Sequence, residues 1–201
     1  MKPSVVPASE MAAPGNRLGF TIVELVVTLT VLGILTAIAV PQFTEFLRNS
    51  RRAATINELV GSLSLARSEA VRRGLPVVMC KAVDDTACRT GAGDTWQAGW
   101  LVFVNTDADS PPVLDAGETV LKVRTVPASG YQLRPSVGVS NFIAFGADGS
   151  AGQAGSFTYC DSRGTPRARA IVVGEVGRVR LSRDTNADGV EEDDDGALSC
   201  P

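Results

Sequence analysis

The sequence predicts an α+β protein in which one long N-terminal helix packs on an antiparallel β-sheet domain. Residues 20–40 form an almost wholly apolar run, which is typical of a membrane-spanning helix. Residues 41–74 keep apolar side chains at helical spacing, and the chain after Gly74 falls into short β-type runs. The expected order is a polar segment at 1–19, a transmembrane helix at 20–40, an amphipathic helix at 41–74 and a β-rich domain at 75–201.

Composition narrows the classes of function. A net charge of -3 argues against a chain that coats nucleic acid by bulk positive charge, although it is compatible with a local basic patch. The chain has no histidine and no Cys-x-x-Cys pair, so a common zinc site is not expected. The even set of 4 cysteines favours disulfides in an oxidising compartment, with buried free thiols as the alternative. Without histidine or a recognisable nucleophile motif, we expect no enzymatic activity.

The apolar run at 20–40 is long enough to cross the roughly 30 Å hydrocarbon core as one helix. A cleaved secretory signal fits poorly, because no small-residue cleavage site follows the run and the polar stretch before it is long. Glu24 lies inside the run, where an unpaired carboxylate costs a few kcal/mol, and it is therefore a candidate functional residue. The alternative is a charge near the helix end that reaches the membrane interface.

Residues 19–25, GFTIVEL, resemble the processing motif of type IV prepilins. The resemblance implies that residues 1–19 are a leader, that prepilin peptidase cuts after Gly19, and that Phe20 becomes the N-methylated first residue. It also implies that Glu24 pairs with the terminal amine of a neighbouring subunit, which offsets the desolvation of both charges during assembly. The chain would then be a single-pass inner-membrane protein with a periplasmic domain, whose partners are other pilin or pseudopilin subunits.

The second part of the helix is expected to be amphipathic. Pro41 removes a backbone donor and can bend or locally break the helix. Gly74 followed by Pro76 predicts the helix end. The apolar stripe that should pack under the sheet consists of Phe43, Phe46, Leu47, Ile56, Leu59, Leu63 and Ala66.

The predicted strands lie within residues 75–82, 99–105, 118–126, 131–134, 141–146, 155–161, 169–175 and 177–183. Trp96, Gly99, Trp100, Val102 and Phe103, followed by the NTDADS loop and GETVL, resemble the domain shared by GspH-type pseudopilins and FimT-type minor pilins. The resemblance covers nearly the whole mature chain and implies a type IV pilin-like fold. We expect the two tryptophans and the phenylalanine to be core residues and not a ligand platform.

Four cysteines permit three pairings, and the residues alone do not decide among them. Proximity favours Cys80 with Cys88 around a polar loop. A similar long-range tether in the resembling family implies Cys160 with Cys200, which would fasten the tail back to the sheet.

Residues 177–180 form a GRxR sequence that resembles the motif by which FimT-type minor pilins bind double-stranded DNA during natural transformation. In a β-type run Arg178 and Arg180 would point to one face beside Gly177, so that two guanidinium groups track successive phosphates. Arg183 extends this region, and further arginines lie close in sequence at Arg163, Arg167 and Arg169. The alternative is a solvated strand face whose arginines pair with the acidic residues that follow.

That acidic stretch follows the pattern D-x-N-x-D-G-x-x-E-x-x-D, which is close to a twelve-residue calcium loop. The oxygen ligands expected at these offsets come from Asp184, Asn186, Asp188, Val190, Glu192 and Asp195. An EF-hand fold is not implied, because no flanking helix pair is evident, and the alternative is a solvated acidic loop. The NTDADS segment has a similar composition, but its spacing is too incomplete to predict a calcium site.

The preferred interpretation is a FimT-like minor type IV pilin that contributes to pilus assembly and to DNA uptake. The alternative is a GspH-like minor pseudopilin of type II secretion with a purely structural role. The sequence leaves the choice between these two machines open, because one scaffold serves both.

Overall fold

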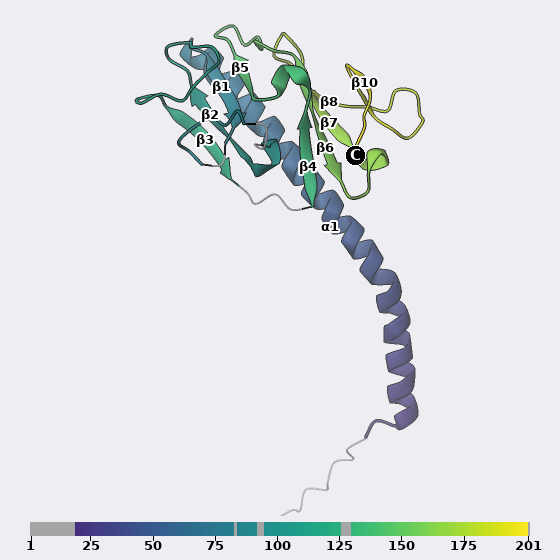
Figure 1. Ribbon diagram of the computed structural model, residues 1–201. Helices are drawn as coiled ribbons and strands as arrows, with labels where there is room; N and C mark the ends of the chain where they lie inside the picture. The colour runs from purple at the N-terminus through teal and green to yellow at the C-terminus, as the bar shows by residue number, and fades with distance from the viewer. Residues whose placement is uncertain (1–18, 83, 92–94, 126–129, 201) are drawn as a thin grey trace, which may run out of the picture. The chain divides into compact units, whose positions relative to one another are not determined.

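The chain forms two compact units, Met1–Arg48 and Asn49–Pro201. The structure, a computed structural model, describes residues 19–82, 84–91, 95–125 and 130–200. The predicted leader, apart from its last residue, therefore lies outside the described residues. The first unit consists of the N-terminal part of helix α1, and the second contains the rest of this helix and the β-strands (Figure 1).

Helix α1, Ile22–Arg73, is continuous over 52 residues. The backbone N–H of Glu24 donates to Thr21 Oγ1 at 3.2 Å, which caps the first turn. The predicted end is confirmed, because Gly74 adopts a φ of 67° and its N–H bonds to the carbonyl of Ala70 at 2.9 Å. The expectation of a local break at Pro41 is wrong: one missing N–H leaves the bonds of the neighbouring turns in place, and the bend stays a prediction.

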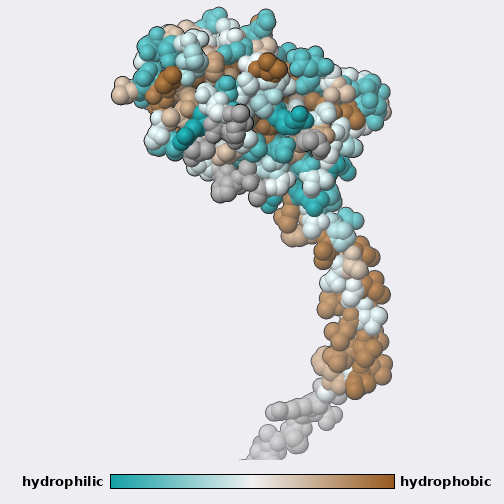
Figure 2. All heavy atoms as spheres, viewed as in Figure 1, coloured by the Kyte–Doolittle hydropathy of each residue, from teal (hydrophilic) through white to brown (hydrophobic). Residues whose placement is uncertain are grey.

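Within the described residues, α1 is the helix that is long and apolar enough to cross a membrane. Figure 2 shows apolar residues covering its N-terminal segment. The side chains of this segment are exposed to the surroundings of the isolated chain, as a membrane-spanning or filament-forming segment requires.

The predicted β-type runs are confirmed as strands, and every run contains one. The bounds are β1 Val77–Lys81, β2 Gly99–Val104, β3 Val120–Thr125, β4 Tyr131–Pro135, β5 Phe142–Phe145, β6 Gly155–Asp161, β7 Arg169–Val173 and β8 Val179–Leu181. They form two four-stranded antiparallel sheets, ordered β3-β2-β1-β5 and β4-β6-β7-β8, where the sequence had suggested one sheet. Three 3₁₀ turns, Trp96–Ala98, Val137–Val139 and Thr165–Arg167, lie between the strands.

The C-terminal half of α1 shares one hydrophobic core with both sheets. The predicted stripe is confirmed at Ile56, Leu59, Leu63 and Ala66, which are buried. It is wrong at Phe43, Phe46 and Leu47, which are exposed because they belong to the first unit, whereas the buried positions begin at Thr55.

The aromatic residues have the predicted core role. Trp96 and Trp100 are fully buried, and the indole N–H of Trp100 donates to Ser62 Oγ of α1 at 2.9 Å. The indole of Trp96 donates to the carbonyl of Ser140 at 3.1 Å. Phe103 is also fully buried, in a second cluster that belongs to the first sheet. Both tryptophans therefore satisfy their polar atoms inside the core.

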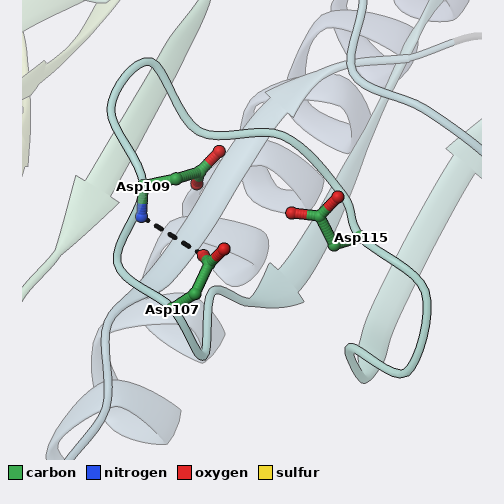
Figure 3. A group of neighbouring side chains, drawn as sticks. All are labelled: Asp107, Asp109 and Asp115. Carbon is green, nitrogen blue, oxygen red and sulfur yellow. Dashed lines mark hydrogen bonds between the residues drawn. The ribbon is translucent and has the colours of Figure 1, made fainter.

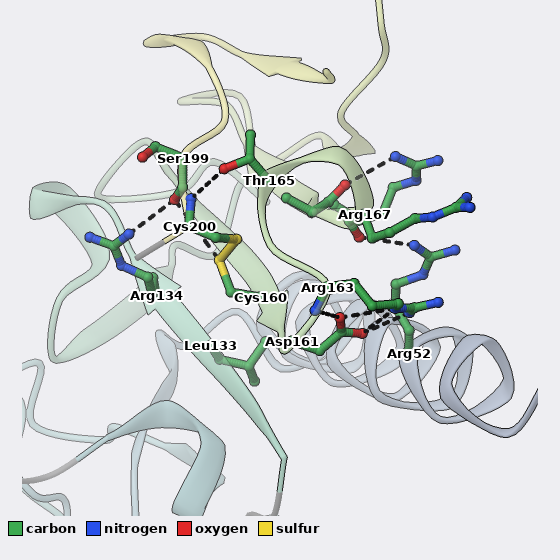
Figure 4. Close-up of a disulfide and its surroundings, with 12 residues drawn as sticks. Arg52, Leu133, Arg134, Cys160, Asp161, Arg163, Thr165, Arg167, Ser199 and Cys200 are labelled. Atoms are coloured by element: carbon green, nitrogen blue, oxygen red, sulfur yellow. Dashed lines mark hydrogen bonds and ion pairs between the residues drawn. A yellow bond between two sulfur atoms is a disulfide. The ribbon is translucent and has the colours of Figure 1, made fainter. Parts of the chain in front are cut away.

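The disulfides pair Cys80 with Cys88 and Cys160 with Cys200, as expected. The second bridge joins β6 to the C-terminal tail across a sequence separation of 40. The tail is held further by Arg134, which donates to the carbonyl of Ser199 at 2.9 Å (Figure 4). It also contains a short hairpin, β9 Glu192–Asp193 and β10 Gly196–Ala197, that the sequence did not predict.

Candidate functional site

A groove with a volume of about 590 Å³ lies where the GRxR sequence meets helix α1. Two serines and two arginines of the helix face the first residues of this sequence. The lining residues are Ser64, Arg67, Ser68, Val71, Arg72, Gly177, Arg178 and Val179. Three guanidinium groups therefore line one groove. Arg72 also pairs with Glu69 at 2.5 Å on the helix surface.

Gly177 is required by the backbone at this place. Its φ is 71°, and a Cβ atom there would lie 2.0 Å from the carbonyl oxygen of Gly149. Arg67 fixes the same region, because its Nε donates to the carbonyl of Gly149 at 2.9 Å and its Nη2 to that of Val176 at 3.0 Å. Arg67 thus positions the turn before β8. The sequence did not predict this role, because the contacts of Arg67 are with residues that lie far away along the chain.

Arg178 directly precedes β8, and Arg180 lies within it. Val179 packs against the core between them, so the alternation of a strand places both arginines on the opposite face. Arg178 is exposed, and within the part of the chain that the structure describes it forms no ion pair. Arg180, which lies opposite Val172 of β7, pairs with Asp194 of the tail.

Two other arginines near the motif form ion pairs. Arg163 pairs with Asp161 at 2.7 Å, and both side chains are nearly buried. Arg169 pairs with Glu191 at 2.8 Å. Arg183 exchanges backbone hydrogen bonds with Glu192, and its side chain is exposed. The sequence left open that arginines here pair with the acidic residues that follow. Arg169 and Arg180 do form such pairs, because the tail folds back beside the second sheet.

A cluster of guanidinium groups surrounds the end of β6 (Figure 4). Arg52 of α1 donates to the carbonyl of Arg167 at 2.9 Å. Burial lowers the pKa of Arg52, and the charges of Arg169 and Arg163 lower it further. The hydrogen bond from Arg163 is the main cause that holds the pKa of Asp161 below its usual value. Asp161 is therefore the internal counter-ion of this cluster.

The acidic loop brings together three of its predicted ligands. Carboxylate oxygens of Asp184, Asp188 and Glu192 lie within 4.8 Å of one another. The side-chain amide of Asn186 donates to Asp188 Oδ2 at 3.1 Å, next to this group. One oxygen of Glu192, Oε1, is buried and has no hydrogen-bond partner among the described residues.

Two other predicted ligands of this loop behave differently. The backbone N–H of Val190 donates to Asp188 Oδ1 at 2.8 Å, which keeps Val190 beside the group. Asp195 is not part of the carboxylate group, because the β9–β10 hairpin turns the chain between Asp193 and Gly196. Its N–H donates instead to Asp193 Oδ1 at 2.9 Å.

A second carboxylate group lies in the loop between β2 and β3. Oxygens of Asp107, Asp109 and Asp115 lie within 4.8 Å of one another (Figure 3). Sequence reasoning considered the NTDADS segment and set it aside. The contribution of Asp115 was not predicted. Asp115 follows Asp109 by six positions, and the fold of the loop brings the two residues together.

The residues of the predicted processing and assembly site lie at the start of α1. Gly19 and Phe20 precede the helix and are exposed, and Glu24 lies in the first turn. An acidic residue in the first turn interacts favourably with the helix dipole.

Comparisons with known proteins agree with this architecture. The family model described as type II transport protein GspH matches residues 55–177, and the prokaryotic N-terminal methylation motif matches residues 15–40. Two fimbrial proteins of Pseudomonas aeruginosa are each 32% identical over 68 residues, which cover 34% of this chain and 44% of each relative. The chain thus matches less than half the length of these curated relatives.

A solved structure has a similar fold. The type IV minor pilin FimU of Pseudomonas aeruginosa superimposes with a TM-score of 0.51 and 21% sequence identity. The alignment covers 78% of this chain and 99% of that chain. At this level of identity the likeness concerns the fold alone.

Proposed function

The chain belongs to the GspH family of type II transport proteins, and on this premise we propose that it is a minor type IV pilin that binds double-stranded DNA. The N-terminal methylation motif and the pilin-like fold support a pilin role. The chain would be anchored in the inner membrane by residues 20–40, with residues 75–201 in the periplasm before assembly. The alternative, a pseudopilin of type II secretion with a structural role, shares this architecture and would bind no DNA.

For assembly, we propose that prepilin peptidase removes residues 1–19 and that Phe20 is N-methylated. The exposed Gly19–Phe20 bond, directly before α1, supports access by a peptidase. Glu24 would then pair with the terminal amine of a neighbouring pilin subunit in the filament.

Co-expression with a prepilin peptidase is expected to lower the mass of the chain by that of residues 1–19 and to add one methyl group. Glu24→Gln should be cut normally but should fail to enter filaments, because a neutral amide does not offset a buried ammonium. Mass spectrometry and filament fractionation measure the two effects. An uncut parent chain, or filaments that contain the variant at the parent level, would contradict the proposal.

DNA binding would use the groove at residues 177–180. The observation that carries this proposal is the exposed side chain of Arg178, which forms no ion pair among the described residues and lines the same groove as Arg72 of α1. Guanidinium groups bind phosphates bidentately and without sequence readout, as uptake of arbitrary DNA requires. Arg180 can join the contact at little cost. Its pair with Asp194 is solvent-exposed, and such pairs contribute about 0–1 kcal/mol.

Duplex DNA binding by the full-length chain in detergent is expected to weaken with salt and to be lost in the double variant Arg178→Gln, Arg180→Gln. Each lost phosphate contact should reduce the slope of log affinity against log salt by about 0.9. Asp194→Asn should strengthen binding, because Arg180 then has no competing carboxylate. Fluorescence anisotropy across a salt series measures these changes.

Lys122→Gln is the matched control, since it removes one positive charge from β3 in the other sheet. It should leave the affinity nearly unchanged. A chain that does not bind DNA at low salt, or a control that weakens binding as much as Arg178→Gln, would reject the DNA role and favour the structural pseudopilin.

We also propose that the acidic loop binds calcium through Asp184, Asn186, Asp188, Val190 and Glu192, with Asp195 near its end. The clustered carboxylates and the unpartnered Glu192 Oε1 support this, because Ca²⁺ prefers oxygen ligands. A bound ion would offset part of the negative field next to the groove arginines.

Calorimetric titration of calcium into the chelator-treated chain should lose one binding event in the variant Asp184→Asn, Asp188→Asn. Asp194→Asn removes a charge from the same tail without touching the carboxylate group and is the control. Equal heats for the parent and the double variant would refute this site.

A further inference from the structure

The loop from Asn105 to Thr119 concentrates negative charge in a way that neither pilus assembly nor DNA binding explains. Asp107, Asp109 and Asp115 bring carboxylate oxygens within 4.8 Å of one another, and their side chains face a common space inside the loop (Figure 3). No lysine or arginine pairs with any of them in the regions that the structure describes. Like charges at this distance repel unless a cation lies between them.

Glu118 closes the loop around this group. Its Oε1 accepts from the backbone N–H of Thr106 at 2.6 Å, and its Oε2 accepts from that of Asp115 at 3.0 Å. One carboxylate therefore joins the two ends of the loop, and it brings Asp115 back to the residues that follow β2. Both donors are neutral backbone N–H groups, so these two contacts add no positive charge to the four carboxylates.

The electrostatics of Asp115 agree with this geometry. Loss of solvent within the loop raises the pKa of its carboxyl group, and the charges of Asp107, Asp109 and Glu118 raise it further. Ionised carboxylates at this spacing repel one another, and a divalent cation between them would remove that repulsion.

An independent observation points to a ligand. The side chain of Asn105 is only 3% exposed and turns toward the loop, where its Nδ2 donates to the carbonyl of Asp109 at 3.3 Å. Its Oδ1 is buried and has no hydrogen-bond partner among the described residues. A buried amide oxygen without a partner is unfavourable, and here it accompanies a cluster of carboxylates.

We propose that the loop between β2 and β3 binds one calcium ion. The ligands are carboxylate oxygens of Asp107, Asp109 and Asp115, with Glu118 completing the shell and Asn105 supporting its base. Counted from Asp107, the acidic residues occupy positions 1, 3, 9 and 12, which are four of the positions that supply ligands in twelve-residue calcium loops. Position 5 and the usual glycine position 6 are occupied by Pro111 and Pro112, so the loop is not an EF-hand loop. The site offers oxygen ligands alone, which suits Ca²⁺ better than Zn²⁺, and a flexible loop of carboxylates suits the variable shell of Ca²⁺ better than the strict octahedron of Mg²⁺.

The test uses the full-length chain in detergent, treated with a chelator and then titrated with calcium chloride to about 10 mM, which covers the range of weak extracellular loops. Asp107→Asn with Asp109→Asn should lower the affinity of one binding event at least about tenfold, because two of its charged ligands are lost. The variant Asp184→Asn, Asp188→Asn should keep this event, which separates it from any binding in the C-terminal loop. Glu175→Gln, a substitution at an exposed residue outside both loops, controls for net charge.

Thermal unfolding gives a second readout. It distinguishes loss of a calcium ligand from a general loss of stability, which would lower the melting temperature with and without calcium. Asp115→Asn should raise the melting temperature in chelator, because it relieves repulsion, and should abolish the rise that calcium causes through this loop. Relative to the parent chain, the variant should therefore melt at a higher temperature in chelator and should gain less stability from added calcium. Unchanged binding in the Asp107→Asn, Asp109→Asn variant, or a calcium response that Asp115→Asn leaves intact, would overturn the proposal.

Discussion

Replacing Trp100 with alanine is expected to lower the free energy of unfolding by about 3–5 kcal/mol, the usual cost of removing a large aromatic side chain from a core. Trp100 is fully buried in the cluster that α1 shares with both sheets. The substitution also removes the hydrogen bond to Ser62 and leaves the guanidinium of Arg124, which lies 4.3 Å from the ring centre, without its aromatic partner. The Arg124 side chain is itself buried, so it cannot turn to solvent.

Urea unfolding of the full-length chain in detergent, followed by circular dichroism, measures this loss. Val137→Ala is the control, since Val137 is 93% exposed and its truncation should change the stability by less than about 0.5 kcal/mol. Trp100→Phe keeps most of the buried area and should fall between the two. If Trp100→Ala were as mild as Val137→Ala, the shared core described above would be wrong.

Gly177→Ala is expected to lower the free energy of unfolding by about 2–5 kcal/mol. An alanine at a φ of 71° is strained by about 1–2 kcal/mol, and its Cβ would lie 2.0 Å from the carbonyl oxygen of Gly149. Forcing these groups apart adds the cost of overpacking, about 1–3 kcal/mol. The backbone of Gly149 cannot move freely, because Arg67 holds its carbonyl.

Gly74→Ala is the matched control for this prediction. Gly74, at the end of α1, has nearly the same φ, 67°, but no atom lies within 4 Å of its added Cβ. Its cost should therefore be the backbone strain alone, and the difference between the two unfolding free energies isolates the clash. Equal costs would show that the contact between residues 149 and 177 does not constrain the turn.

The Gly177 prediction separates two roles within the GRxR sequence. The glycine is needed for the turn against α1, whereas Arg178 is exposed and is available to a ligand. A variant at the glycine should lose stability first and DNA affinity only as a consequence. Arginine variants at positions 178 and 180 should lose DNA affinity while the unfolding free energy stays nearly unchanged, because neither side chain is in the core.

The acidic tail reduces the positive charge of the surface around residues 177–180. Asp194 pairs with Arg180 and Glu191 pairs with Arg169, so two of the basic residues are already neutralised. Salt screens the solvent-exposed pair of Arg180 with Asp194 as it would screen a contact with phosphate. In the proposed DNA contact, affinity should therefore depend on the charges of the tail as well as on Arg178 and Arg180.

Local patterns in the sequence determined the long apolar helix, the helix end at Gly74, the strands and the core role of Trp96 and Trp100. These features were predictable because apolar periodicity and turn-forming residues act over a few neighbouring positions. The pairing of Cys160 with Cys200 was expected from the family resemblance, because no local pattern joins residues that are 40 positions apart. The prepilin motif at residues 19–25 is likewise a local signal, and it lies within the N-terminal methylation motif that matches residues 15–40.

Tertiary structure alone decided the division of the strands into two sheets, the position of Arg67 behind Gly177, and the approach of Asp115 to Asp107. It also decided which acids neutralise Arg169 and Arg180 and why Asp195 does not join the carboxylates before it. Each of these features joins segments that are separated along the chain or by a turn. Their contact depends on how the core brings α1, the sheets and the tail together, and no pattern of neighbouring residues contains that information.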